Sequence, residues 1–138
     1  MKELHSKRID DKIIPDAVIL GYSDIDTLHH EMTLQLETAI AIHDSKLIIA
    51  LTQLQLHSEH HFAFEESLMT EQRFAGYSEH RHEHQQILAE FNSMINAVAR
   101  GRYRLARAWL HDRLPEWFRL HVANLDGLLV SFLKQRRA

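Results

Sequence analysis

The sequence contains no cysteine and very little glycine or proline. Its 138 residues include four glycines and two prolines. The lack of cysteine excludes disulfide bonds, iron–sulfur clusters and zinc sites built from thiolates. So few glycines and prolines do not suit the many turns of an all-β chain. The composition therefore favours helices joined by a few short connections.

Long apolar runs are missing as well. The N-terminal segment has no apolar stretch of signal-peptide length, and runs such as 47–51 are too short to span a membrane. The net charge is −3, with both signs interspersed. We therefore expect a cytoplasmic protein whose partners include neither nucleic acid nor a membrane. The length and the 45% hydrophobic content fit a single domain over residues 1–138.

Hydrophobic residues recur every three or four positions in four segments. This period predicts helices at about residues 24–42, 46–73, 78–100 and 116–134, after an N-terminal arm at 1–23. Ser78 is a candidate N-cap, and Pro115 is expected to kink or restart the last helical block. Short connections favour antiparallel neighbours. The pattern therefore predicts an all-α fold, an up-down-up-down four-helix bundle over residues 24–134.

Histidine is unusually abundant, and several histidines occupy positions where a helix should be apolar. Five of the twelve histidines and one glutamate lie on the inward stripes, and one aspartate lies a position off its stripe. These residues are His29, His61, Glu65, His80, His84, His121 and Asp126. The predicted inward stripe of the last helix is Leu114, Phe118, His121, Leu125, Leu128 and Phe132. Burying a polar group without a partner costs several kcal/mol, so seven together indicate a shared partner in the core.

The natural shared partner is a metal. At a rise of about 1.5 Å per residue, all seven side chains can lie in one layer of the bundle. Within each of the pairs His61–Glu65 and His80–His84, the spacing of four places both residues on one helix face. Five imidazoles and two carboxylates are too many for one tetrahedral zinc ion, and they suit two octahedral transition-metal ions. This donor set favours iron, with manganese or zinc as substitutes.

The sequence leaves two features of this layer open: how His121 and Asp126 come together, and whether His57 contacts a histidine of the layer. His121 and Asp126 are five residues apart, which does not place them on one face of an ideal helix. Either a local widening of the helix or an aspartate that reaches sideways would bring them together. His57, one turn before His61, is a candidate partner for the second ring nitrogen of a metal-bound imidazole.

Four motifs, one on each expected helix, resemble those of the hemerythrin family. They are the segments Gly21–His29 (GYSDIDTLH), His61–Met69 (HFAFEESLM), His80–His84 (HRHEH) and Trp117–Asp126 (WFRLHVANLD). Each motif alone is weak, but all four in this order are highly specific. The chain most resembles the bacterial single-domain hemerythrins, or bacteriohemerythrins, from about residue 21 to residue 126.

The resemblance implies a non-haem di-iron centre. One iron would be held by His80, His84 and His121, and the other by His29 and His61. Glu65 and Asp126 would bridge them, together with an oxo or hydroxo group. O2 would bind as a ligand at an open position on the two-histidine iron. The implied O2 pocket contains Phe118, Val122 and Leu28; Phe118 is larger than the leucine often found there, and Leu28 replaces a common glutamine.

These features predict an O2-binding protein for storage, delivery or sensing rather than an enzyme. Only two carboxylates are available, whereas ferritin-like di-iron enzymes use roughly four. Two alternatives stay open: a di-iron oxidase, peroxidase or nitric-oxide-consuming enzyme on the same bundle, and a metal-responsive interaction protein. The sequence also leaves open a protein recipient or signalling partner, and the oligomeric state.

Overall fold

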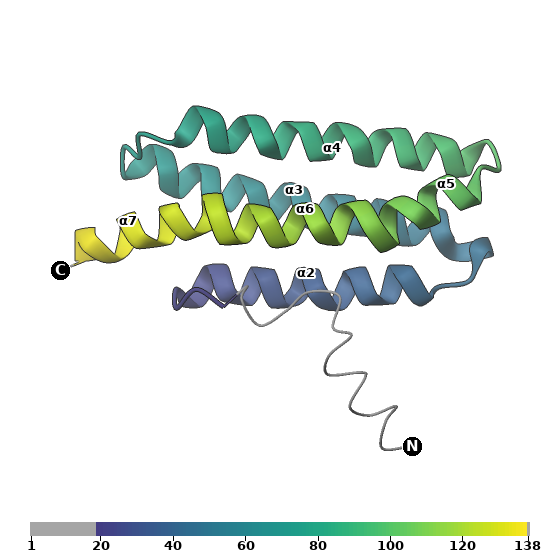
Figure 1. Cartoon of the computed structure of the whole chain (residues 1–138), viewed down its shortest axis with the longest axis horizontal. Coiled ribbons are helices and arrows are strands. Elements are labelled where there is room, and N and C mark those ends of the chain that lie inside the picture. The colour runs from purple at the N-terminus through teal and green to yellow at the C-terminus, as the bar shows by residue number, and fades with distance from the viewer. Residues whose placement is uncertain (1–18, 138) are drawn as a thin grey trace, which may run out of the picture.

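The fold is a bundle of four long helical rods (Figure 1). The computed structural model describes residues 19–137. The first three rods are α2 (Ser23–Ala41), α3 (Leu47–Glu71) and α4 (Tyr77–Ala99), and a 3-10 turn at Asp44–Lys46 joins the first two. The fourth rod consists of α5 (Tyr103–Ala108), a π-helical turn (Trp109–Arg113), α6 (Leu114–His121), a second π-helical turn (Val122–Asp126) and α7 (Gly127–Arg137). Successive rods run in opposite directions, which confirms the predicted up-down-up-down bundle.

The first three helices begin and end close to the predicted residues, whereas the fourth rod already begins at Tyr103. Most of the expected N-terminal arm, residues 1–18, lies outside the described part of the chain. The α4 helix begins at Tyr77, so Ser78 lies inside its first turn and the predicted N-cap was wrong. Gly101, with φ +82°, follows the end of α4. None of the helices within residues 19–137 is both long and apolar enough to cross a lipid bilayer.

Arg107 on α5 forms hydrogen bonds with the connection between α2 and α3. Its guanidinium donates hydrogen bonds to the carbonyl oxygens of Ile40 and Ile42, at 3.2 and 2.6 Å. It also donates to Asp44 Oδ1 at 2.6 Å. The last carbonyls of a helix have no partner within the helix and favour a nearby cation. Arg107 therefore ties the C-terminal end of α2 to the fourth rod.

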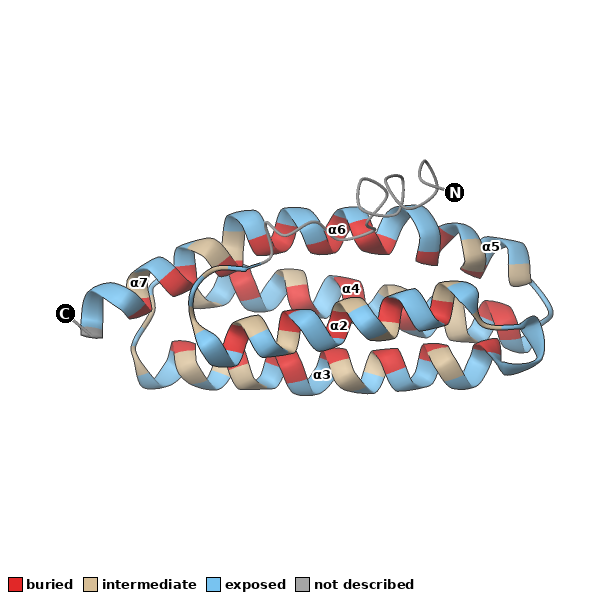
Figure 2. Cartoon of the chain, turned by 90° about the horizontal axis from the view of Figure 1, so that it is seen from below, coloured by how far each residue is buried: buried red, intermediate tan, exposed pale blue. Residues whose placement is uncertain are grey.

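The apolar core is divided into two clusters. Figure 2 shows buried positions along the inner faces of all four rods. The larger cluster includes Met32, Leu36, Leu54, Ile87 and Phe91. The smaller consists of Ile25, Met69, Leu129, Val130 and Leu133, from the ends of α2, α3 and α7. A layer of buried polar side chains lies between the two apolar clusters.

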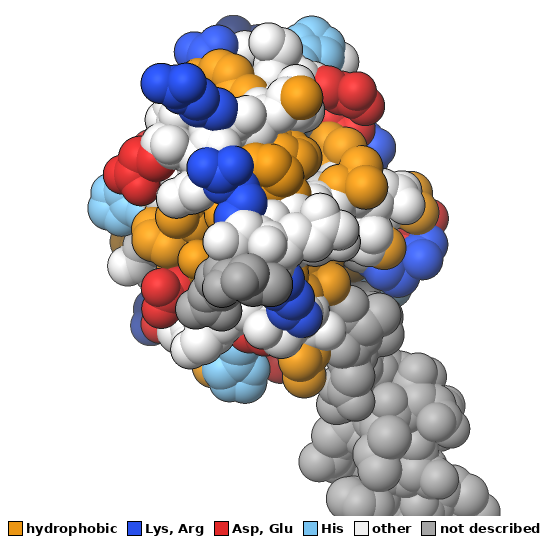
Figure 3. Space-filling model, turned by 90° about the vertical axis from the view of Figure 1, so that its left-hand side faces the viewer, with side chains coloured by type: hydrophobic (Ala, Val, Ile, Leu, Met, Phe, Trp, Pro, Cys, Tyr) orange, Lys and Arg blue, Asp and Glu red, His pale blue; other side chains and the backbone are white. Residues whose placement is uncertain are grey.

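The smaller cluster closes the end of the bundle that carries the α3–α4 turn. Figure 3 looks onto this end, where hydrophobic, basic and acidic side chains are mixed on the surface. Phe74 and Phe132 pack against the cluster, with ring centroids 5.1 Å apart. The Arg136 guanidinium lies 5.5 Å above the Phe132 ring and donates to Gln72. Packed side chains therefore separate the polar layer from this end.

The inward stripe of the fourth rod differs from the prediction. Leu128, expected in the core, is 62% exposed, and Leu125 and Phe132 are only partly buried. The residues that follow two of them, Leu129 and Leu133, are buried instead. The π-helical turn at residues 122–126 accommodates one extra residue, so every later inward position moves along the chain by one.

Candidate metal centre

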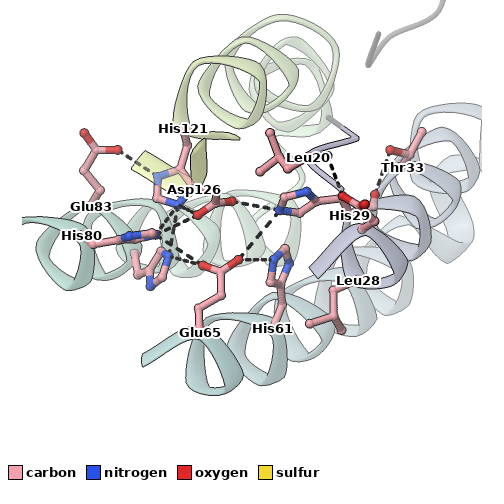
Figure 4. Close-up of polar contacts among 12 residues, drawn as sticks. Leu20, Leu28, His29, Thr33, His61, Glu65, His80, Glu83, His121 and Asp126 are labelled. Carbon is pink, nitrogen blue, oxygen red and sulfur yellow. Dashed lines mark hydrogen bonds and ion pairs between the residues drawn. The ribbon is translucent and has the colours of Figure 1, made fainter. Parts of the chain in front are cut away.

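All seven predicted residues meet in one layer of the bundle, and each is at most 3% exposed. Figure 4 shows imidazoles from all four rods directed toward two carboxylates at the centre. The seven residues are His29 on α2, His61 and Glu65 on α3, His80 and His84 on α4, and His121 and Asp126 on the fourth rod. The layer predicted from helix depth is therefore present in the structure.

Glu65 stands between two sets of histidines. Its Oε2 atom lies 2.8 Å from His61 Nε2 and 3.8 Å from His29 Nε2. Its Oε1 atom lies 3.3 Å from His80 Nε2 and 3.2 Å from His84 Nε2. The two oxygens of one carboxylate thus face different imidazole groups, which is the arrangement that a bridging ligand requires.

Asp126 has the same relation to the two sets. Its Oδ2 atom lies 2.9 Å from His29 Nε2, whereas Oδ1 lies 2.8 Å from His80 Nε2 and 3.2 Å from His121 Nε2. The π-helical turn directly after His121 makes this possible, because a π-helix pairs residues five apart. Of the two explanations for this spacing, the local widening of the helix is correct.

The imidazoles of His84 and His121 direct their Nε2 atoms at each other. Nδ1 of His84 lies 2.8 Å from Glu66 Oε2, and Nδ1 of His121 lies 3.0 Å from Glu83 Oε1. An ionised carboxylate only accepts hydrogen bonds, so each Nδ1 carries a proton, and the lone pair of such a ring without a second proton is on Nε2. These two Nε2 atoms are 3.1 Å apart. Such an arrangement repels unless a proton or a metal ion lies between the rings.

The donor atoms form two groups suited to metal ions. One group comprises Glu65, His80, His84, His121 and Asp126, and the other comprises His29, His61, Glu65 and Asp126. Two donors about 2.1 Å from one ion and at right angles are about 3.0 Å apart. The nitrogen–nitrogen separations of 3.1 Å match this value. In addition, the buried Glu65 Oε1 and Asp126 Oδ1 atoms make no hydrogen bond. The residues present therefore fit a pair of metal ions.

Without a metal, protons take the place of the cations. Burial lowers the pKa of His29, but contacts with Asp126 and Glu65 outweigh it and raise the pKa to about 10. For His121 burial also lowers the pKa, and the charge of Asp126 raises it to about 9. Burial and the charge of Glu65 raise the pKa of Asp126, yet His121 and His29 hold it below its usual range. The two carboxylates of the centre thus favour positive charge nearby, whether it is carried by metal ions or by protonated histidines.

Aromatic rings pack around the imidazoles. Phe62 stacks on His84 with ring centroids 3.9 Å apart, and Trp117 stacks on His121 at 4.5 Å. Phe118 meets His29 edge to face at 5.4 Å. These contacts limit the rotation of the imidazoles and so keep their nitrogens directed at the centre.

The three predicted pocket residues do not share one environment. Phe118 and Val122 are almost completely buried. Leu28 is only partly buried, and Figure 4 shows its side chain outside the ring of histidines, away from the central carboxylates. Phe118 therefore borders the centre at His29, Val122 belongs to the larger apolar cluster, and Leu28 is peripheral.

The hydrogen-bond partners outside the seven residues were not predicted. The hypothesis for His57 was wrong, because its Nε2 donates to the Leu28 carbonyl at 3.4 Å and His61 Nδ1 has no partner. The partners are instead Glu66 and Glu83. Each contact joins residues on different rods. Helical spacing, which relates residues on one helix, could not have identified them.

Comparison with known proteins agrees with this site. Residues 20–133 match the family described as "Hemerythrin HHE cation binding domain". The chain is 31% identical over 121 residues to a protein named Bacteriohemerythrin from Ralstonia nicotianae, with 88% of each chain covered. No solved structure matches the chain significantly. The matched segment contains all seven residues of the buried polar layer, and the chain belongs to the hemerythrin family.

Proposed function

We propose that the seven residues hold two iron ions and that the protein binds O2 reversibly. His80, His84 and His121 are the histidine ligands of one ion. His29 and His61 are those of the other. Glu65 and Asp126 bridge the pair, and an oxo or hydroxo group completes the bridge. Imidazole donors suit transition metals such as iron rather than Mg²⁺ or Ca²⁺, and the absence of thiolates makes this a non-sulfur iron site.

The inequality of the two donor groups carries this proposal. One group offers five residues and the other four, and they share both carboxylates. An octahedral ion has six positions, so a bridging oxygen completes the first group and leaves the second with one position open. A metal site that keeps an open position binds an external ligand, whereas a closed site is structural. The open position lies on the His29 and His61 side.

Phe118 forms an apolar boundary on that side. Phe118 is 1% exposed and meets the His29 ring edge to face, and Val122 is also buried. When bound, two ferrous ions supply the electrons that reversible O2 binding requires. Phe118 and Val122 keep water away from the centre, which limits proton delivery and therefore irreversible oxidation. Glu65 and Asp126, as bridging ligands, would keep the distance between the two ions fixed.

The number of carboxylates favours a carrier over an enzyme. The buried layer contains two carboxylates and five histidines, whereas ferritin-like di-iron enzymes use roughly four carboxylates. Fewer anionic donors leave a more positive centre, which disfavours the strongly oxidised iron that oxidases need. We therefore propose a role in O2 storage, delivery or sensing.

Spectroscopy of the reconstituted protein tests the proposal. The full chain is loaded with ferrous iron without O2, exposed to O2 and then degassed. We expect a visible absorption band that appears with O2, disappears on degassing and returns over repeated cycles. Irreversible oxidation in the first cycle, together with turnover of peroxide or nitric oxide, would instead identify the enzyme. A protein that binds metal but never develops the band would be left with a structural or signalling role.

A further inference from the structure

Two carboxylates outside the seven buried residues contact the centre through its histidines. Glu66 on α3 accepts a hydrogen bond from His84 Nδ1 at 2.8 Å, and Glu83 on α4 accepts one from His121 Nδ1 at 3.0 Å. Figure 4 shows Glu83 on the outer side of His121, opposite the central carboxylates. The side chains of Glu66 and Glu83 are 24% and 37% exposed. Both therefore connect a buried imidazole to the surface of the bundle.

These contacts are distributed unequally over the two donor groups. Both histidines that receive an anionic partner, His84 and His121, belong to the five-residue group. Nδ1 of His61 in the four-residue group and Nδ1 of His80 in the five-residue group are both buried and make no hydrogen bond. The five-residue group thus has more donors, and carboxylates outside the centre hold two of its three histidines.

We propose that Glu66 and Glu83 are positioning residues that make the His80–His84–His121 group the tighter of the two metal sites, so that the first ion binds there. The inference rests on the proposed two-metal centre. A carboxylate that accepts the Nδ1 proton holds the imidazole in the tautomer whose Nε2 lone pair faces the ion. It also pushes electron density into the ring, so the nitrogen becomes a stronger donor. In the four-residue group, His61 Nδ1 has no such partner.

A purely structural role would give a different result. Both glutamates are partly exposed, and exposed ion pairs contribute little to folding stability. Their replacement by glutamine should therefore leave the bundle folded. The loss should instead appear in metal affinity, where removal of such a partner typically costs about 10–100-fold.

Glu90 provides a matched control. It lies two helical turns after Glu83 on α4, and its side chain is 34% exposed. It accepts hydrogen bonds from Arg113 and from the Trp109 indole instead of from a histidine of the centre. Glu90→Gln therefore removes a similar carboxylate from the same helix without altering any group that faces the metal.

Stepwise titration of the metal-free full chain with Co²⁺ tests the inference. Binding is followed by the visible cobalt spectrum, with a competing chelator for the tighter step. In the unchanged protein we expect two steps, and in His61→Ala only the first. Glu66→Gln and Glu83→Gln should each weaken the first step by about 10–100-fold and leave the second within about threefold. Glu90→Gln should change neither step.

The outcomes separate this inference from the proposed centre. If the unchanged protein binds fewer than two Co²⁺ ions, the two-metal centre is wrong and the inference fails with it. If it binds two ions but Glu66→Gln and Glu83→Gln retain the original first step, only the inference fails. Equal weakening of both steps would also overturn it, because that result indicates a general loss of structure. Partial recovery of the first step in Glu83→Asp, which restores the charge, would support it.

Discussion

His121 and Asp126 are separated by five positions in the sequence, yet His121 Nε2 lies 3.2 Å from Asp126 Oδ1. The π-helical turn at Val122–Asp126 produces this contact. It also sets the register of α7, where Leu129 and Leu133 face the core and Leu128 faces solvent. One local feature therefore positions a carboxylate of the metal centre and a part of the apolar core.

An added residue in the π-helical turn should disrupt both the metal centre and the packing of α7. Insertion of one alanine after Asn124 rotates Asp126 and all of α7 by about 100° relative to His121. We expect the protein to lose at least one of two bound ions. We also expect it to lose on the order of 3 kcal/mol of unfolding free energy, because buried leucines turn outward. Metal analysis and urea unfolding measure the two effects.

Asn124→Ala is the control, because it introduces the same residue without changing the spacing. The side chain of Asn124 is exposed, so this variant should bind two ions and unfold like the unchanged protein. An insertion variant that keeps both ions would show that the π-helical turn does not determine the position of Asp126.

The metal-free protein should lose stability as the pH rises above neutrality. The histidine pKa values of about 10 for His29 and about 9 for His121 exceed the unfolded value of about 6.5. Protonation therefore stabilises the fold fully below pH 6.5, and this stabilisation is lost as the pH rises through 9 to 10. At about 1.4 kcal/mol per pH unit for each group, we expect a loss on the order of 7 kcal/mol between about pH 6.5 and about pH 9.5. Urea unfolding after chelation measures it.

The metal-loaded protein provides the contrast. A metal ion binds deprotonated imidazole, so loading releases protons and metal affinity should increase with pH. In the metal-free state, Asp126→Asn removes a carboxylate that raises the pKa of both histidines, so it should flatten the alkaline slope. A metal-free protein whose stability is constant from pH 6.5 to alkaline pH would contradict the ion pairing seen in the centre.

Phe118→Leu should speed the irreversible oxidation of the iron-loaded protein. The smaller side chain leaves space beside the His29 ring, through which water can approach the open position. We expect the O2-dependent band to decay several-fold faster. Phe91→Leu is the control, since Phe91 is equally buried but packs against Trp109. Both variants should lose about 1–2 kcal/mol of stability, so equal decay rates would assign the effect to general destabilisation.

Arg107→Ala should destabilise the bundle without changing the metal centre. It removes hydrogen bonds to Ile40, Ile42 and Asp44 at the end of α2. Because the guanidinium is partly exposed, the expected loss is roughly 1–2 kcal/mol of unfolding free energy. The stoichiometry of metal binding should stay the same. Arg104→Ala, a change at an exposed residue of the same helix, should have no measurable effect on unfolding, and a similar loss there would discount the role of Arg107.

Regular helix geometry explains which features could be predicted. The inward stripe of α2, from Ile25 to Ala39, is buried as expected because the period is unbroken there. The polar layer could be found because polar residues on such a stripe are costly and occurred at matching depths on four helices. Asp126 fell off its stripe because helical periodicity assumes about 3.6 residues per turn, and the π-helical turn departs from that value.

Contacts between helices could not be derived in the same way. Glu66 and Glu83 are ordinary charged residues beside stripe positions, and nothing in their spacing distinguishes them from Glu90. Their partners depend on how α3, α4 and the fourth rod are rotated against one another. His57 was a candidate because it lies one turn from His61, but its ring is directed to the Leu28 carbonyl. Proximity along one helix was a poor guide to hydrogen bonding between helices.

Anomalous diffraction from crystals of the iron-loaded protein, measured at the iron absorption edge, tests the central claim most directly. We expect two peaks roughly 3.5 Å apart. One should lie within coordination distance of His80, His84 and His121, the other should lie within that distance of His29 and His61, and both should contact Glu65 and Asp126. A single peak, or iron bound away from these residues, would contradict the proposed two-metal centre.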